Sequence, residues 1–359
     1  MRRLRSTLLL LAVLAAGTVY ASEEYRIENW AVGLDHPWSL AFLPEGGALV
    51  TERPGALRPV SVDGQVGAPL IGVPAVYHAG QGGLFDVVLH PDFERNRLVY
   101  LCFAEGTPDD NGTAIARGEY RDGGLSGVTA IFRNFTRKDT AVHYGGRMAF
   151  LPDGTLLLTT GDGFDYREAA QDVNSGLGKV LRMTADGRPA PGNPFPESPY
   201  VYSYGHRNPQ GLVVAPGGTV WLHEHGPRGG DEINRIEAGE NYGWPAVTHG
   251  VDYSGAVISP YSEWPGMVSP LWDWTPSIAP SGLLLYQGER FPQWRGDLLV
   301  GALVDREVRR LRLEAGAPVE EEALFDELEA RVRDVRSGPD GLIYLLLPDR
   351  IVRVVPAGY

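Results

Sequence analysis

Arg147-Met-Ala-Phe-Leu-Pro-Asp-Gly154 recurs in modified form along the whole chain and is the strongest indication of its fold. It reads as an apolar strand, a tight Pro-Asp-Gly turn and the entry to a second apolar strand. Proline presets φ at such a turn and glycine takes its left-handed position, so each copy predicts a hairpin. The other copies begin at Trp38, Leu84, Gly211, Gly282 and Val335, and the one at Gly282 is degenerate, with its turn at Phe291-Pro292.

These copies lie roughly 45 to 70 residues apart, a spacing typical of propeller blades with several strands each. The alternative is a β-sandwich with coincidental turns, but copies distributed from end to end favour a closed ring. We therefore predict an all-β fold, a six-bladed β-propeller of four-stranded antiparallel blades, in a single catalytic domain over residues 22–359. Convincing helical stretches are hard to find, and residues 326–331 form a helical turn at most.

The first 21 residues read as a removable export signal. Arginines open it, an apolar core follows at 8–16, and Val19-Tyr20-Ala21 supplies a small-x-small cleavage pattern. A membrane anchor is less favoured, because the apolar run is too short to span a bilayer comfortably. We expect cleavage near Ala21, a periplasmic or secreted protein, and no stable membrane insertion.

Composition limits the partners and the chemistry. A net charge of −13 disfavours nucleic acid and suits neutral sugars or divalent cations. The single cysteine, Cys102, excludes an internal disulfide and a cysteine-based metal site. Nearly all basic residues are arginines, since the only lysines are Lys138 and Lys179.

Function in a propeller usually lies where loops from several blades meet at one end of the channel. His143, followed by Tyr-Gly-Gly, precedes the third repeat, and Asp162 follows the second strand of the same hairpin. If that hairpin is regular, its two ends lie side by side, and Asp162 orients His143 as a general base. The alternative is that His143 merely caps a loop and Asp162 makes a turn.

Two arginine segments are candidate anchors for an anionic ligand. Arg207 and Asn208 precede a strand and offer a planar cation beside an amide, which suits an anionic or carbonyl-bearing cofactor. Arg331 and Arg333 lie on one face of an incoming strand. For Arg207 a surface salt bridge is the alternative, equally favoured by this segment alone, and for Arg331 and Arg333 the alternative is a solvated face.

The densest polar segment runs from His223 to Glu232. His223 and His225 share one face of a strand, but no third ligand at a recognisable spacing completes a zinc or copper site. The Gly, Pro, Asp and Glu content instead favours oxygen ligands and calcium. A plain acidic loop is the remaining alternative.

The chain carries neither a dinucleotide-binding or P-loop glycine motif nor a nucleophile elbow or paired zinc-binding histidines. Taken together, its segments resemble the soluble PQQ-dependent glucose and aldose sugar dehydrogenases, where PQQ is pyrroloquinoline quinone. The resemblance spans essentially the whole mature chain. Its marks are Gly80-Gln-Gly-Gly-Leu84, His143-Tyr-Gly-Gly-Arg147, Tyr204-Gly-His-Arg-Asn-Pro-Gln-Gly211, Glu224-His-Gly-Pro-Arg-Gly-Gly-Asp-Glu-Ile-Asn234, Asn241-Tyr-Gly-Trp-Pro245 and Ser277-Ile-Ala-Pro-Ser281.

The resemblance implies oxidation of the C1 hydroxyl of aldose sugars to lactones, by direct hydride transfer to PQQ with calcium as a Lewis acid. It implies that His143 is the base, that Asp162 orients it, and that Arg207 stabilises developing charge. The PQQ-binding residues it implies are Gln81, Arg207, Asn208, Arg331 and Arg333. The metal ligands it implies are Gly226 and Pro227, through their carbonyls, for the cofactor-bound calcium, and Glu232 and Tyr242 for a second, structural calcium.

One departure concerns the fifth blade, where the glucose dehydrogenases carry a cofactor-contacting lysine and this chain has Val300-Gly-Ala-Leu-Val-Asp305. The general aldose branch therefore fits better than the glucose-specific enzymes. The rival hypotheses are a calcium-dependent, lactonase-like propeller hydrolase and a non-catalytic sugar-binding propeller. The electron acceptor, the preferred sugar and the choice between monomer and homodimer stay open.

Overall fold

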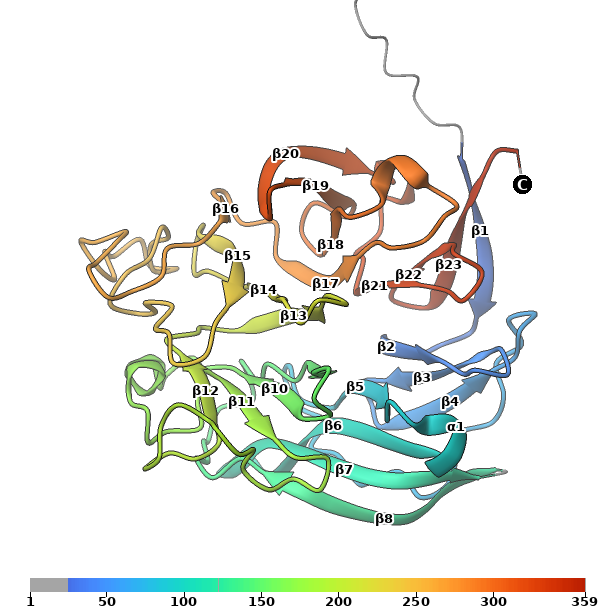
Figure 1. Cartoon of the computed structure of the whole chain (residues 1–359), viewed down its shortest axis with the longest axis horizontal. Coiled ribbons are helices and arrows are strands. Elements are labelled where there is room, and N and C mark those ends of the chain that lie inside the picture. Colours follow the sequence, from blue (N-terminus) through green and yellow to red (C-terminus); the bar gives the residue numbers. More distant parts are fainter. Residues whose placement is uncertain (1–24, 122, 359) are drawn as a thin grey trace, which may run out of the picture.

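The recurring hairpins form the inner half of each blade of a propeller. The computed structural model describes residues 25–121 and 123–358, and the predicted export signal and its cleavage point lie outside these residues. The strands form six antiparallel sheets arranged in a ring (Figure 1). The prediction of an all-β, six-bladed propeller is confirmed.

The strands of the first three blades run outward from the channel in chain order. The first blade contains β2 (Pro37–Phe42), β3 (Ala48–Glu52) and β4 (Ala56–Val60). The second contains β5 (Leu84–Leu89), β6 (Leu98–Thr107), β7 (Asp110–Arg121) and β8 (Gly124–Arg133). The third contains β9 (Met148–Phe150), β10 (Leu156–Thr160), β11 (Lys179–Met183) and β12 (Val201–Tyr204).

The last blade takes its outermost strand from the other end of the chain. The fourth blade contains β13 (Pro209–Val214), β14 (Val220–Glu224), β15 (Asp231–Ile236) and β16 (Trp272–Trp274). The fifth contains β17 (Pro280–Leu285), β18 (Leu298–Ala302), β19 (Val308–Glu314) and β20 (Ala317–Leu324). The sixth contains β21 (Asp334–Ser337), β22 (Ile343–Leu346), β23 (Arg350–Pro356) and, paired with β23, β1 (Tyr25–Val32).

The outer edge of the first blade is irregular. A fourth segment lies along β4, with the Leu70 N–H donating to Leu57 O at 2.8 Å and the Gly67 N–H to Pro59 O at 2.8 Å. Because Pro59 has no N–H, it offers this segment only its carbonyl, and a regular ladder cannot form there.

Helical structure among the described residues is limited to single turns, as the sequence predicts. These are α1 (Phe93–Asn96) and the 3-10 turns η1 (Arg167–Gln171), η2 (Pro292–Trp294) and η3 (Asp326–Leu328). The α1 and η2 turns join the inner strands of the second and fifth blades, where the repeat departs from Pro-Asp-Gly. In the regular copies glycine takes the left-handed position, as at Gly154 with φ 80°. None of the helices in residues 25–121 and 123–358 has the length and apolar character needed to cross a membrane.

Alternation along the second strand of each blade builds the core. In β10, Leu156 and Leu158 pack toward the second blade, whereas Leu157 packs toward the fourth. In β18, Leu298 and Val300 likewise face one neighbour and Leu299 the other. Such strands are buried on both faces and therefore read as continuous apolar runs.

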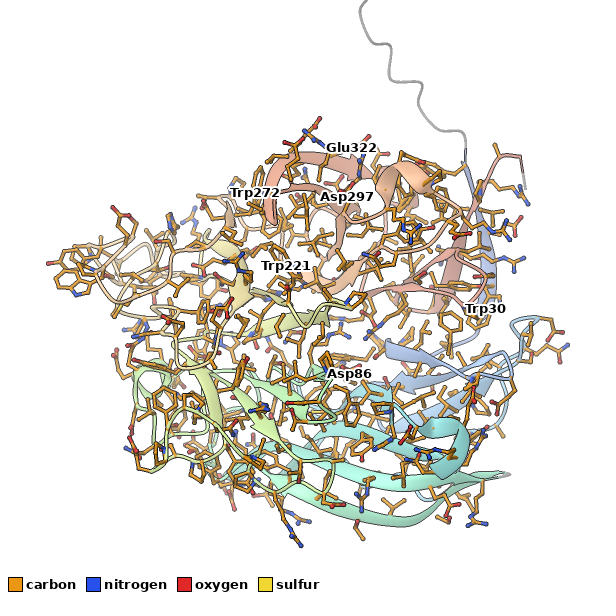
Figure 2. The ribbon with its side chains drawn as sticks, in the orientation of Figure 1. Trp30, Asp86, Trp221, Trp272, Asp297 and Glu322 are labelled. Carbon is orange, nitrogen blue, oxygen red and sulfur yellow. The ribbon has the colours of Figure 1, made fainter. Side chains whose placement is uncertain are left out.

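The inner strands β2, β5, β9, β13, β17 and β21 contact one another around the channel. Asp86, on β5, lies near the centre of the ring, whereas Trp30 and Glu322 lie toward its outside (Figure 2). All six inner strands begin at the same end of the channel. The segments just before them, together with those that follow the second strands, surround the site described next.

Candidate active site

His143 and Asp162 lie at the two ends of the β9–β10 hairpin and meet at the channel mouth. His143 Nδ1 is 2.7 Å from Asp162 Oδ1, and both side chains are buried. Gly161 makes this approach possible, because a Cβ there would come within 2.3 Å of the His143 carbonyl oxygen. The hairpin thus brings together the two residues that the sequence analysis paired.

The Asp162 carboxylate is held from three sides. Its Oδ2 accepts the Trp244 indole N–H at 2.7 Å, and its Oδ1 accepts the Phe164 backbone N–H at 2.8 Å. With Oδ1 also facing His143 Nδ1, the proton of the neutral imidazole lies on Nδ1 and the Nε2 lone pair is left to accept another proton. This arrangement suits a general base.

Burial keeps the His143 imidazole neutral. It lowers the pKa of His143 below its usual value near 6.5. The hydrogen bond and charge of Asp162 oppose that shift, while Arg207 and Lys138 add to it. His143 is therefore unprotonated at neutral pH, as a proton acceptor must be.

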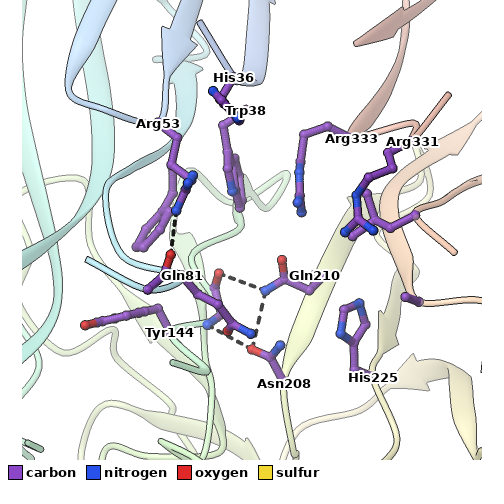
Figure 3. A pocket seen from close by; sticks show the side chains of 15 residues that line it. His36, Trp38, Arg53, Gln81, Tyr144, Asn208, Gln210, His225, Arg331 and Arg333 are labelled. Carbon is purple, nitrogen blue, oxygen red and sulfur yellow. Dashed lines mark hydrogen bonds between the residues drawn. The ribbon is translucent and has the colours of Figure 1, made fainter. Parts of the chain in front are cut away.

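A cavity of about 370 Å³ is lined by residues from all six blades (Figure 3). Neither His143 nor Asp162 lines it, but Tyr144, the residue after His143, does. Gln81 lines it and accepts the His143 backbone N–H through Oε1 at 2.8 Å. Four residues predicted from the sequence to bind a cofactor line it, namely Gln81, Asn208, Arg331 and Arg333. The lining residues that were not so predicted include Arg53, Trp38, Tyr144, Gln210, His225 and Leu303.

Three lining arginines, Arg53, Arg331 and Arg333, have no carboxylate partner among residues 25–121 and 123–358. In Figure 3 their side chains approach the cavity from two sides. Burial, followed by the charges of Arg147, Arg331 and Arg53, lowers the pKa of Arg333 to about 9. Unpaired like charges around one hollow are costly unless a ligand of opposite charge enters it.

Arg207 lies outside the lining of this cavity and faces a neighbouring hollow of about 270 Å³. Its Nη1 donates to Gly226 O at 2.6 Å and to His225 O at 3.2 Å. Its backbone N–H donates to the Glu224 carboxylate, which also meets His206 Nδ1 at 2.8 Å. Its carbonyl accepts the Asp162 backbone N–H at 2.8 Å, so Arg207 is fixed between the fourth blade and the dyad.

The predicted metal ligands fall in one region of the fourth blade. Gly226 and Glu232 both line a narrow space of about 10 Å³, and Pro227 lines the 270 Å³ hollow. Glu232 pairs in register with Glu224 on one side and Asp273 on the other. Burial and repulsion from Glu224 raise the pKa of Glu232 well above its usual range.

Tyr242 lies next to this region and stacks on the His206 ring, with 4.8 Å between the ring centroids. Its hydroxyl is already used, since it donates to Arg235 O at 2.7 Å and accepts the Glu237 N–H at 2.8 Å. Its backbone carbonyl is therefore the better candidate to bind a metal. No group of three or more His, Cys, Asp or Glu side chains in the described part of the chain is arranged to hold a metal.

Comparison with known proteins identifies the family. Residues 34–354 match the model of the glucose/sorbosone dehydrogenase family. The chain belongs to that family. The aldose sugar dehydrogenase YliI of Escherichia coli (strain K12) is 42% identical over 326 residues, which cover 87% of each chain.

Solved structures of family members agree with the propeller. A crystal structure of a glucose dehydrogenase matches with a TM-score of 0.89 at 44% identity and covers 93% of this chain and 99% of that chain. The PQQ-bound form of an aldose sugar dehydrogenase from Streptomyces coelicolor matches with a TM-score of 0.78 at 32% identity, with coverages of 93% and 99%. The family resemblance inferred from the motifs is confirmed.

Three residues at the candidate active site of this chain were not predicted from the sequence. Trp244 stood in a quoted motif, but nothing in the sequence says that its indole reaches Asp162, 82 positions away. Glu224 also stood in a quoted motif, but nothing in the sequence says that its carboxylate holds the Arg207 backbone N–H and the His206 ring. Arg53 carries no motif, and only its place directly after a buried strand could have drawn attention to it.

Proposed function

We propose that this protein oxidises the C1 hydroxyl of aldose sugars to lactones with PQQ as cofactor. The observation that carries the proposal is the 370 Å³ cavity with three carboxylate-free arginines beside a neutral, carboxylate-oriented histidine. A polyanionic ligand would neutralise the arginines, and a substrate with a hydroxyl group would give its proton to the histidine. The PQQ-bound relative supports the same combination.

The residues present fit PQQ, a planar tricarboxylate with quinone oxygens. Arg331 and Arg333 would bind its carboxylates, since the guanidinium fork matches a carboxylate with two parallel hydrogen bonds. The amides of Gln81 and Asn208, which also line the cavity, would donate to its remaining oxygens. The bound cofactor supplies the two-electron acceptor, whose chemistry is its own.

The protein contributes the general base and the electrostatic field in which the reaction takes place. His143 accepts the proton of the C1 hydroxyl at Nε2, and Asp162 stabilises the imidazolium that results. Trp244 and Phe164 keep the carboxylate in place for this step. Arg207, which faces the neighbouring hollow, would offer positive charge to the bound cofactor from that side.

Two calcium sites complete the proposal. The Gly226 and Pro227 carbonyls would hold the ion that acts as a Lewis acid on the cofactor, because backbone carbonyls are hard oxygen ligands. Arg207 Nη1, which donates to Gly226 O, would have to turn away from that carbonyl when the ion binds. Glu232 and the Tyr242 carbonyl would hold a second ion. The in-register carboxylates of Glu224 and Asp273 support that second site, because a cation would relieve the repulsion that raises the pKa of Glu232.

We further propose export, with cleavage near Ala21 and function in the periplasm or outside the cell. A separate electron acceptor must then reoxidise the cofactor. The net charge of −13 favours an acceptor that is not strongly acidic.

The decisive experiment adds PQQ and calcium to the purified protein and measures aldose-dependent reduction of a dye. His143→Asn is the variant of choice, because His143 has φ 51° and asparagine tolerates that conformation. Turnover should fall about 10²- to 10⁴-fold while PQQ stays bound, since the imidazole removes a proton and does not anchor the cofactor.

The matched control is His90→Asn, in the turn after β5 at the far end of the channel, which should keep full turnover. Dye reduction that does not depend on PQQ would exclude this cofactor. Near-native turnover in His143→Asn would remove the histidine from the mechanism. Lactone hydrolysis without dye reduction would favour the propeller hydrolase, and sugar binding without either reaction would favour the binding protein.

A further inference from the structure

Arg53 has a backbone that is fixed between two blades. It follows β3 directly, and its N–H donates to His36 O at 3.0 Å while its carbonyl accepts the Leu84 N–H at 2.9 Å. Gly83 allows the second contact, because a Cβ there would come within 2.2 Å of Arg53 O. The side chain is therefore directed into the 370 Å³ cavity, next to Gln81 (Figure 3).

Only part of the Arg53 guanidinium is used within the protein. Its Nη1 donates to Gly80 O at 2.7 Å and approaches Gly82 O at 3.4 Å, on the loop that carries Gln81. Its Nε and Nη2 have no acceptor in the part of the chain that the structure describes. Two donors on one edge of the fork thus remain for a ligand.

The acidic residue nearest in sequence does not neutralise Arg53. Glu52 accepts the Asp35 backbone N–H at 2.9 Å and pairs with Arg58 at 3.6 Å. The charge of Arg53 instead acts across the cavity, where its repulsion contributes to the lowered pKa of Arg333. At the fifth blade the cavity wall presents Leu303, which brings no charge.

We propose that Arg53 is a cofactor-binding residue that grips one carboxylate of the ligand through Nε and Nη2. With Nη1 it simultaneously holds the loop from Gly80 to Gly82, and so positions Gln81 against the His143 backbone. The ligand is then held by cations from the first blade as well as from the sixth. This assignment deepens the proposed function and rests on it in taking PQQ as the ligand.

The test measures PQQ affinity for Arg53→Gln and Arg53→Lys by quenching of tryptophan fluorescence, since Trp38 lines the cavity. Arg53→Gln should weaken binding about ten-fold or more, the usual effect of losing a charge-assisted pair. It should also flatten the dependence of affinity on sodium chloride. Arg53→Lys should keep that dependence but recover only part of the affinity, because lysine has no fork.

Arg95→Gln is the control, since Arg95 is an exposed arginine paired with Asp92 near α1. It removes the same charge from the molecule and should bind PQQ as the wild type does. Thermal unfolding of each ligand-free variant shows whether loss of the loop contact alone explains the result. If Arg53→Gln is destabilised and yet binds PQQ with wild-type affinity and salt dependence, Arg53 is a structural residue and the assignment is wrong.

A second probe separates this assignment from the proposed function. Benzene-1,2,4-tricarboxylate is planar and trianionic but has no quinone. Wild-type protein that binds it and not PQQ would overturn the proposed cofactor, and its loss of affinity in Arg53→Gln would still establish Arg53 as an anion-binding residue. Wild-type protein that binds neither probe would overturn both.

Discussion

The arginines at the centre of the channel and those at its mouth differ in one respect, the presence of acidic partners. At the centre, Arg147 Nη2 lies 3.1 Å from Asp334 Oδ1, and Arg336 Nε lies 2.8 Å from Asp334 Oδ2. Asp86 lies 3.3 Å from Arg336 and 3.8 Å from Arg147. Arg147, Asp334, Arg336 and Asp86 thus form a closed circle of ion pairs, the central circle. At the mouth, Arg333 precedes Asp334 by a single residue and has no such partner in the described residues.

Arg147 also joins the blades to one another. Its guanidinium donates to Gln210 O at 2.7 Å and to Ser281 O at 3.3 Å, and it lies over the Trp38 ring at 4.1 Å from the centroid. The two regions therefore differ in how their charges are balanced. The charges at the centre are balanced within the protein, whereas no acidic side chain of the described residues balances those of the arginines at the mouth.

Breaking the central circle should have the largest effect. Arg147→Met leaves Asp86 and Asp334 with one arginine between them, and an uncompensated buried charge costs about 3–5 kcal/mol of unfolding free energy. Urea unfolding followed by circular dichroism measures the loss. Adding Asp334→Asn should restore part of it, because the two positions are coupled. A loss below about 1 kcal/mol, the average for any substitution, would contradict a stabilising role for the circle.

Removing a cation at the mouth should not destabilise the ligand-free protein. Arg333→Gln should weaken PQQ binding about ten-fold while leaving the ligand-free protein as stable as before or slightly more so, because repulsion from Arg147 and Arg331 is relieved. Calorimetric titration and thermal unfolding measure the two effects. Equal destabilisation by Arg333→Gln and Arg147→Met would erase the distinction between mouth and centre.

Calcium removal should lower the thermal stability through the sites at the channel mouth and not through the central circle. An ion that binds only the native state stabilises it by about 2.7 kcal/mol at a hundred-fold excess over Kd, so chelation should lower the melting temperature. Magnesium should not restore it, since magnesium demands a stricter geometry. In Glu232→Gln the effect should shrink, and in Arg147→Met it should persist. Identical unfolding curves with calcium and after exhaustive chelation would argue against a structural ion.

The smallest expected effect is a shift of the pH profile. Because the pKa of His143 lies below its usual range, turnover should hold through neutral pH and decline only on the acid side, as the imidazole becomes protonated. Asp162→Asn removes the charge that favours the imidazolium, so the acid limb should move to lower pH even though the maximal rate falls. Rates measured from pH 4 to 8 decide it, and a limb that moves upward would contradict this view of the dyad.

The sequence predicted the blades because their signal is local. Each hairpin carries its own turn, and the glycine of each regular copy can be read without knowing its neighbours. The pairing of β1 with β23 was not predicted, because the two strands lie at opposite ends of the chain and neither contains the repeat. Pro59 could have warned of an irregular first blade, had the outer strands been assigned.

The same contrast holds for the site. His143 and Asp162 are the two ends of one hairpin, so regular geometry alone predicts that they meet. Trp244 and Arg53 reach the site from other blades, and no local pattern records such a contact. The central circle was missed for the same reason, since Asp86 and Asp334 meet Arg147 only once the ring is closed.

The closure of the sixth blade makes the chain suitable for circular permutation. Tyr25 is the register partner of Pro356, so the two ends of the folded ring lie on adjacent strands. A short linker could join them, and new ends could be opened at the exposed turn of Ala315 and Gly316 between β19 and β20. In such a protein β1 and β23 would form an ordinary hairpin, and attachment to an electrode or a fusion partner could be moved from the sixth blade to the fifth.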